Sequence, residues 1–529
     1  MNDDLRQRQQ LLKIGTARAG RAPAPPAAPL DALFPQAEAE TTLWLSLGAL
    51  DLWERSGFLP SAGPASPALD PAPPEHLRPC PARAEAILAM LLHGVHPAAL
   101  QSEWLRLLQR HGGYLPARFL PRMLDTATRQ PAQRAQLLPV LGERGQWLAH
   151  LHADWTWATA GASADEREAA WETGTPEQRL AALCTWRARD PQSARAALEA
   201  AWPSEAPEQR AALLPALGVN LGLADEAFLE AVLGDRRKEV RTAAQRLLAS
   251  LPGSQLGQRM LARLLPLLRV EKPWLGKARL ELALPEAYDA AMRRDGIGAS
   301  AHQGMGEKAG WVVDMLAAVD PNVWCRQFER DPRECLVLAE SSEFAAVLVR
   351  GWALAALRQA ERDDASPDVQ DWLQALALWW VASTGDLSKA VPDTLFDLIA
   401  ARFHANAGGA SLALLDAYPD NWPQDADLVN LLHRLADKAQ DSWTPAPTQR
   451  FLQLLKAIRP GTLKPGNTWL ARMLLPAFGK VADPASVAAV EAEWRAGVPL
   501  DSDWHATIDY FFNLVRLRRE MILSFQEPA

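Results

Sequence analysis

The stretch ADEAFLEAVLGDRRKEVRTAAQRLLASLPGS, from Ala224 to Ser254, decides the fold because it contains two amphipathic segments and the turn between them. In its second half, apolar residues recur at the spacing of one buried helix face, at Val240, Ala243, Ala244, Leu247, Leu248 and Leu251. Pro252 and Gly253 are stop signals, and Asp235 is predicted to cap the helix start. The second half is therefore predicted to be a helix.

The first half of the same stretch predicts a shorter helix that packs against the second. Asp225 is its predicted cap, and Gly234 alone is expected to separate the two helices. Two helices joined in this way form a helical hairpin. The order of an Asp at the turn and a Val-Arg pair, Val240 and Arg241, resembles the HEAT repeat.

An internal repeat extends this pattern along the chain. The trio Glu177-Gln178-Arg179 returns as Glu208-Gln209-Arg210 and then as Glu239-Val240-Arg241, with a spacing of 31 residues. A period of about 30 to 45 residues with two helices per unit is typical of an α-solenoid, whose units bury their apolar faces only against neighbours. The predicted fold class is therefore all-α, an α-solenoid of HEAT-like helical hairpin repeats with a Pro-rich N-terminal segment.

Composition agrees with this prediction and limits the function classes. Segments with strand-like alternation are nearly absent, and the 529 residues exceed what a single compact core accommodates. The net charge of -8 disfavours nucleic acid as a partner of the whole surface. Four scattered cysteines do not suggest a disulfide framework, and neither a signal sequence nor an apolar run of spanning length is evident. We expect a cytoplasmic protein.

Changes in composition suggest four segments. Residues 1–82 are predicted to hold N-terminal helices, among them Thr41–Arg55, and a Pro-rich strap at Pro60–Pro81. HEAT-like repeats are predicted over 83–285, a glycine-containing loop over 286–310, and further helical repeats over 311–529. The last of these helices is expected at Trp504–Phe525.

Several longer strings resemble a bacterial family of unknown function. They are LPVLGERGQWLA at 138–149, FLEAVLGDRRKEVRTAAQRLLASLP at 228–252, GMGEKAGW at 304–311, LAAVDPNVW at 316–324 and GWALAALRQ at 351–359. Members of that family are typically encoded beside MoxR-type AAA+ ATPases, von Willebrand factor A domain proteins and SWIM zinc-finger proteins. The resemblance implies a shared complex with such proteins and provides no catalytic residues.

The sequence motifs of phosphate-binding and metal-binding sites are incomplete in this chain. Gly296–Gly310 lacks the GxxxxGK pattern of a phosphate loop, and His93 and His96 near Cys80 lack paired metal ligands. Cys325 and Cys335 are interpreted as small buried hydrophobic residues, and most of the 21 tryptophans as core. Pairs such as Trp379 and Trp380 leave open base or sugar stacking. We therefore expect no enzymatic activity, cofactor or metal.

One charge anomaly remains. From Asp235 to Arg279 there are eleven Lys or Arg against three Asp or Glu, in a chain that is acidic overall. This basic stripe is either a solvated face or a binding surface. The favoured hypothesis is a scaffold or adaptor that binds a protein partner through Arg236, Arg237, Lys238 and Arg241. The alternative is a nucleic-acid-binding repeat protein that uses the whole stripe, 235–279.

Overall fold

The protein was studied as a computed structural model that describes residues 10–15, 38–56, 69–94, 96–159, 170–271, 278–298, 302–362, 367–383, 397, 410–419, 422, 426–439, 442–458, 469–496 and 503–526. It divides into two compact units, Met1–Pro71 and Ala72–Ala529. In the first unit, α3 (Ala39–Ser56) confirms the predicted helix at Thr41–Arg55. The four predicted segment boundaries remain predictions.

The described part of the Pro-rich strap contains no helix. Residues 57–68 lie outside the described part of the chain, and from residue 69 to Pro81 no helix forms. The Arg78 amide donates to the Gly112 carbonyl and its carbonyl accepts from the Tyr114 amide, both at 2.9 Å. The Glu75 carboxylate accepts from the Glu143 amide. These bonds tie the strap to the helices that follow it.

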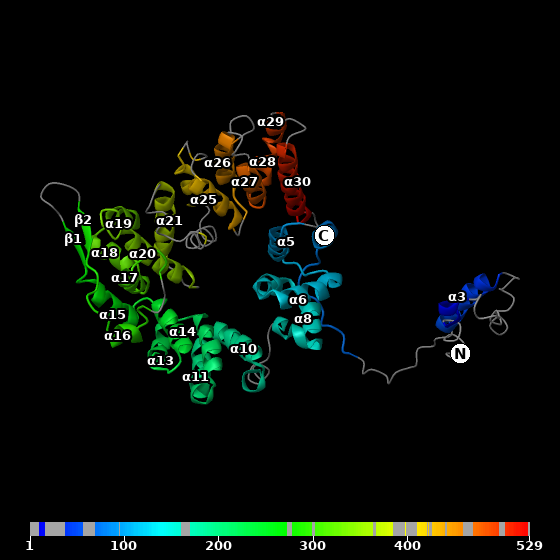
Figure 1. Cartoon of the computed structure of the whole chain (residues 1–529), viewed down its shortest axis with the longest axis horizontal. Helices are drawn as coiled ribbons and strands as arrows, with labels where there is room; N and C mark the ends of the chain where they lie inside the picture. Colours follow the sequence, from blue (N-terminus) through cyan, green and yellow to red (C-terminus); the bar gives the residue numbers. More distant parts are fainter. Residues whose placement is uncertain are drawn as a thin grey trace. The chain divides into compact units, whose positions relative to one another are not determined.

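The described helices of the second unit follow one another along the chain (Figure 1). The first group comprises α4 (Ala82–His93), α5 (Ala98–His111), α6 (Leu120–Arg129), α7 (Arg134–Leu137) and α8 (Gly142–Leu151), with short 3-10 turns η2 (Ala117–Phe119), η3 (Pro131–Gln133), η4 (Leu138–Val140) and η5 (Ala153–Ala158). The second group comprises α10 (Pro176–Arg189), α11 (Pro191–Ala201), η6 (Trp202–Ser204), α12 (Pro207–Leu213), η7 (Leu214–Gly218), η8 (Leu223–Asp225), α13 (Glu226–Val232), α14 (Lys238–Ala249) and α15 (Gln255–Leu264).

A two-stranded antiparallel sheet interrupts the helices. Strands β1 (Leu268–Glu271) and β2 (Arg279–Leu282) pair with Leu268 opposite Leu282 and Arg269 opposite Glu281. Leu268, Leu280 and Leu282 are buried while the charged residues between them are exposed. This hairpin was not predicted, because four-residue strands are too short to establish a periodicity.

Helices then continue to the C-terminal end. They are α16 (Ala290–Arg294), α17 (Glu307–Ala317), α18 (Asn322–Phe328), α19 (Pro332–Ala339), α20 (Ala345–Ala360), α21 (Pro367–Ala382), α24 (Ala410–Asp416), α25 (Ala426–Asp437), α26 (Pro445–Leu455), η10 (Lys456–Ile458), α27 (Trp469–Gly479), α28 (Pro484–Ala488), α29 (Glu491–Ala496) and α30 (Asp503–Ser524). The predicted last helix is confirmed as α30. The described chain is mostly helical, which confirms the all-α class. Of the described helices, none is long and apolar enough to cross a membrane.

Helix α14 confirms most of the predicted buried face. Val240, Ala244 and Leu248 are fully buried, whereas Ala243 is only half-buried. The predicted turn was wrong in length, because α13 ends at Val232 and α14 begins at Lys238. Five residues therefore separate the two helices, rather than Gly234 alone.

The predicted cap at Asp235 was wrong, and the one at Asp225 is confirmed in position only. The N-cap position of α14 is Arg237, and the Asp235 carboxylate instead accepts the Arg237 amide at 2.9 Å and pairs with Arg210 at 3.0 Å. Asp225 is the N-cap residue of α13 but makes no side-chain bond to that helix, and its carboxylate accepts the Gly222 amide at the start of η8. It is buried and forms two hydrogen bonds with the Arg187 guanidinium, at 3.0 and 2.9 Å. Both carboxylates meet arginines of preceding helices, and that competing charge-assisted interaction accounts for the difference.

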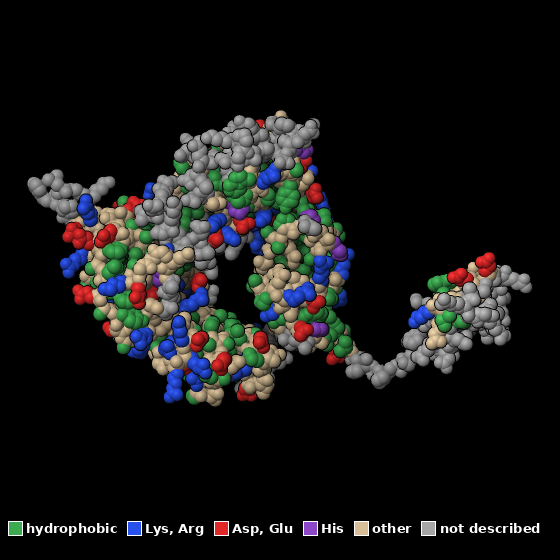
Figure 2. Space-filling model, viewed as in Figure 1, with side chains coloured by type: hydrophobic (Ala, Val, Ile, Leu, Met, Phe, Trp, Pro, Cys, Tyr) green, Lys and Arg blue, Asp and Glu red, His purple; other side chains and the backbone are tan. Residues whose placement is uncertain are grey.

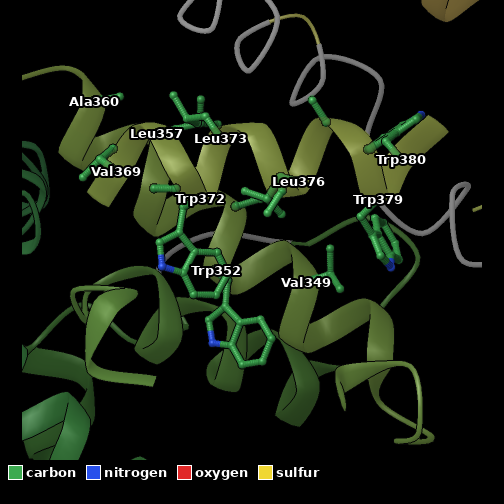
Figure 3. Close-up of a cluster of buried hydrophobic side chains, with 14 of the residues drawn as sticks. Val349, Trp352, Leu357, Ala360, Val369, Trp372, Leu373, Leu376, Trp379 and Trp380 are labelled. Carbon is green, nitrogen blue, oxygen red and sulfur yellow. The ribbon is translucent and has the colours of Figure 1, made fainter. Parts of the chain in front are cut away.

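The most completely buried helix is α20. Trp352 on α20 and Trp372 on α21 are both inaccessible to solvent, and their ring centroids lie 5.6 Å apart. Figure 3 shows the two indoles turned toward one another beneath Leu373 and Leu376. Trp379 and Trp380 belong to the same cluster and are buried as well. Of four tryptophans predicted from the sequence to lie on buried helix faces, Trp104, Trp352 and Trp372 are confirmed as core residues, whereas Trp186 is only half-buried.

Two separate hydrophobic cores fill the second unit. One gathers residues of α4 to η5 and also Leu514, Met521 and Phe525 from α30 or its end. The other runs from Trp171 to Val515. Helix α30 thus contributes to both cores, and Figure 1 shows it beside α5.

A buried ion pair accompanies this contact. Arg518 on α30 is fully buried and bonds Glu103 of α5 at 2.7 and 2.9 Å. The Ser442 hydroxyl lies 2.7 Å from both partners and completes the network. Replacing one member would leave the opposite charge buried without a partner.

We expect Arg518→Gln to lower the free energy of unfolding by about 3 to 5 kcal/mol, the range for breaking a buried ion pair. Urea unfolding of the full chain, followed by circular dichroism and tryptophan fluorescence, measures the change. Arg519→Gln is the matched control, because Arg519 is the next residue on α30 and is exposed. Equal stability of the two variants would contradict the proposed importance of the ion pair.

Candidate functional site

The predicted partner-binding residues lie at the start of α14. Arg236, Arg237 and Lys238 are exposed, and Figure 2 shows Lys and Arg side chains at the surface over α13 and α14. Arg237 approaches Glu208 at 3.9 Å, with both side chains largely exposed. Among the described residues, neither Arg236 nor Lys238 has an ion-pair partner. These three cations are therefore available to a partner.

Arg241 has a different position from the other three. It is half-buried, and its guanidinium donates to the carbonyls of Asp235 and Arg236, both at 2.9 Å. The side chain folds back onto its own turn, so its donors are engaged within the chain. Arg241 acts as a stabilising residue of the turn, which places it outside the exposed group.

The repeated arginines share this role. Arg179 and Arg210 each lie over the ring of the tryptophan eight residues earlier, Trp171 and Trp202, and donate to its carbonyl. Each also pairs with a carboxylate further along the chain, Glu205 for Arg179 and Asp235 for Arg210. Arg179 and Arg210, which are 31 residues apart, thus make the same kind of Trp-Arg-carboxylate contact.

Most other described cations of the basic stripe lie next to carboxylates. Arg259 and Arg263 both pair with Asp295, and Arg259 also pairs with Glu230. Arg269 and Arg279 stand opposite Glu281 and Glu271 across the hairpin. The remaining two lysines lie at 272–277, outside the described residues. The local excess of positive charge counted along the sequence therefore overstates the charge available at the surface.

A cleft of about 750 Å³ lies beside the exposed cations. Its walls are η7 with the residues that follow it, α14, and the end of α20. Pro215, Leu221 and Leu247 contribute apolar surface, and Lys238 links the cleft to the exposed cations. This is a feature that the sequence analysis missed.

The end of α20 brings further charges to the cleft. Arg358, Glu361 and Arg362 line it together with Arg246 and Glu239 of α14. Burial lowers the pKa of Arg358, with Asp314 acting in the opposite direction. The one hydrogen bond that Arg358 makes to described residues goes to the Ala317 carbonyl, at 2.8 Å. The cleft therefore holds a poorly solvated cation together with the apolar side chains of Pro215, Leu221 and Leu247, which we call its apolar floor.

The glycine-rich segment is not arranged to bind phosphate. Gly298 has a φ of +74°, and its amide donates to the Asp314 carboxylate at 2.8 Å. The other Asp314 oxygen lies 2.8 Å from His302 Nε2. A carboxylate of the chain itself thus occupies the position where an anion would meet a glycine amide. The loop predicted at 286–310 includes α16 and is therefore partly helical. Residues 299–301 lie outside the described chain.

Metal ligation also finds no support at the positions considered. His93 places Nδ1 2.7 Å from the Ala89 carbonyl of its own helix. Burial raises the pKa of Cys80 to about 12, with Glu85 adding to the effect, so this thiol is protonated near neutral pH. Within the described ranges, no group of three His, Cys, Asp or Glu residues could hold an ion.

The interpretation of Cys325 and Cys335 as small buried hydrophobic residues holds for Cys335 only. Cys335 is buried, whereas Cys325 is half-buried. A hydrogen bond from the Cys335 thiol lowers the pKa of Cys325, against the opposing effect of burial. The same bond and burial raise the pKa of Cys335, and burial raises that of Cys184.

The described residues thus define a mostly helical protein whose second unit carries exposed cations next to a cleft. The chain belongs to the family described as Family of unknown function (DUF5691), which matches residues 8–525. No curated protein and no solved structure matches the chain.

Arg241→Ala should lower the free energy of unfolding by about 1 to 3 kcal/mol, because a charged donor to two carbonyls is lost. Arg236→Ala should change it by less than about 0.5 kcal/mol, as expected for an exposed residue. Thermal and urea unfolding of the two variants make the comparison. If both variants match the unaltered protein, the turn does not depend on Arg241.

N-ethylmaleimide at pH 8 should modify Cys325 before Cys80, Cys184 and Cys335. Its lowered pKa gives it the largest thiolate fraction of the four, and the thiolate is the reacting form. Peptide mass spectrometry over time gives the order of modification. Cys80 reacting first would contradict its raised pKa.

Proposed function

We propose that this protein is a non-catalytic scaffold or adaptor that binds an acidic surface of a protein partner. The observation that carries the proposal is the exposure of Arg236, Arg237 and Lys238, while the other described cations of the stripe have carboxylates or carbonyls nearby. The architecture we propose is an α-solenoid of HEAT-like hairpins. The recurring Trp-Arg-carboxylate contact between repeats supports it.

The position of these cations adds a physical argument. Lys238 is the first residue of α14 and Arg237 is its N-cap. A positive charge near a helix N-terminus opposes the helix dipole, at about 0.3 to 1 kcal/mol per charge. Cations at this place therefore do not favour the helix, and binding is a reason for their presence. As partners we propose a MoxR-type AAA+ ATPase, a von Willebrand factor A domain protein or a SWIM zinc-finger protein.

Nucleic acid is the weaker alternative. Arg259, Arg263 and Arg241 are engaged within the chain, which removes much of the track that a phosphate backbone would follow. The buried Trp379 and Trp380 have no surface on which a base could stack. A protein partner fits these observations better.

Changing Arg236, Arg237 and Lys238 together to Glu should leave the circular dichroism spectrum unchanged and weaken partner capture. The loss should appear mainly as a slower association rate, because surface charges steer encounter. Surface plasmon resonance with the three proposed partners measures the rates at several salt concentrations. Capture by the native host's proteins identifies which of them binds.

The matched control reverses three other exposed arginines, Arg129, Arg144 and Arg333, so that the net charge change is equal. If both triple variants bind the partner equally well, the exposed cations of α14 are only a solvated face. A steep fall of affinity for a DNA or RNA duplex with salt, lost in the α14 variant alone, would favour nucleic acid instead.

A further inference from the structure

The cleft between α14 and the end of α20 has the dimensions of a ligand site. Its volume of about 750 Å³ falls within the range of pockets that enclose small ligands or anchoring side chains. The apolar side chains of Pro215, Leu221 and Leu247 line it. An apolar group entering the cleft would be removed from water, which is favourable. The floor thus selects for an occupant with an apolar side chain.

The charges of the cleft select for an anion next to that side chain. Four cations, Lys238, Arg246, Arg358 and Arg362, outnumber the two carboxylates Glu239 and Glu361. Arg358 is the most informative of them, because a guanidinium has five N–H donors and it uses one for the Ala317 carbonyl. A carboxylate meeting this poorly solvated cation would form a charge-assisted hydrogen bond.

The Arg246–Glu361 pair illustrates the same chemistry within the chain. The two groups lie 3.4 Å apart, and their side chains are 70% and 43% exposed. An exposed pair of this kind contributes little to stability. Glu361 therefore places a carboxylate of the chain where an incoming carboxylate could replace it.

We propose that this cleft binds a short acidic peptide segment, with an apolar side chain of the segment on the floor and flanking carboxylates at Arg246 and Arg358. This inference rests on the proposed function, since it specifies how an acidic partner is held. A nucleic-acid strand fits less well, because Glu239 and Glu361 interrupt the cations and the floor is apolar. The exposed cations at the start of α14 then steer the partner, while the cleft holds it.

A random dodecapeptide display library, selected against the full chain, tests the proposal without knowledge of the partner. Enriched peptides should carry a Leu, Phe or Trp next to Asp or Glu. Gly218→Leu is the blocking variant. Gly218 is exposed and lines the cleft, and the only contact of a Cβ built there is Leu247 at an ordinary 3.7 Å. This variant should bind the best selected peptide at least tenfold more weakly, as measured by fluorescence polarisation.

Two single substitutions give shifts of opposite sign and do not depend on blocking the cleft. Arg246→Gln should weaken binding of the selected peptide about tenfold, because it removes a cation and leaves Glu361 facing the ligand. Glu361→Gln should tighten binding several-fold, because it removes the competing carboxylate. A structural role of this pair would shift both variants in the same direction. Arg333→Gln, on α19, is the control and should have no effect.

The proposal is overturned if enriched peptides lack acidic residues, if Gly218→Leu and Glu361→Gln both leave the peptide affinity unchanged, or if a single-stranded oligonucleotide displaces the peptides.

These results can be distinguished from a failure of the proposed scaffold function. Loss of partner capture in the α14 triple variant, together with peptides that ignore the cleft, would retain the scaffold function and reject this site. Peptides that depend on the cleft, together with partner capture that ignores the triple variant, would retain the site and reject the exposed cations as the steering surface.

Discussion

The ion pair between Glu103 and Arg518 is the interaction on which the arrangement of the second unit depends. Helices α4 to η5 form their own core, and α30 contributes side chains both to that core and to the other core. A buried ion pair is costly to desolvate and contributes little net stability compared with apolar packing. Its value lies in specificity. Leu514, Met521 and Phe525 could slide along an apolar face, whereas Arg518 must meet Glu103, and this fixes the register of α30.

The parts of the fold that were predictable are those with local causes. The face of α14 and the extent of α30 follow from the spacing of apolar residues within a single helix, which needs no partner to be visible. The bonding of the two aspartates was not predictable, because an Asp before a helix fits equally well as a side-chain cap or as the partner of a distant arginine. Asp225 stands at the N-cap position of α13, but the carboxylates of Asp225 and Asp235 pair with Arg187 and Arg210. The sequence pattern is the same in the two cases, and only the tertiary contact distinguishes them.

The candidate site also has a part that could be predicted from the sequence and a part that could not. Arg236, Arg237 and Lys238 were recognisable because consecutive cations stand out along a chain. The cleft was not, since Arg246 and Glu361 are 115 residues apart and the segment around Glu361 reads as an acidic loop. A count of charges along the sequence was also misleading. Asp295 lies outside the stripe and engages two of its arginines, and no feature of the sequence connects them.

Helix α30 contributes to both hydrophobic cores, and this has a consequence for synthesis on the ribosome. Helices α4 to α8 emerge well before α30, and the apolar surface that receives Leu514 and Met521 stays uncovered until α30 has been made. At translation rates of about 5 to 20 residues per second, that interval is roughly 20 to 70 s. During this time the nascent chain exposes both an apolar patch and the unpaired carboxylate of Glu103. Such a chain favours binding of a chaperone that shields the patch until α30 has been made, and truncation before α30 would leave the patch exposed permanently.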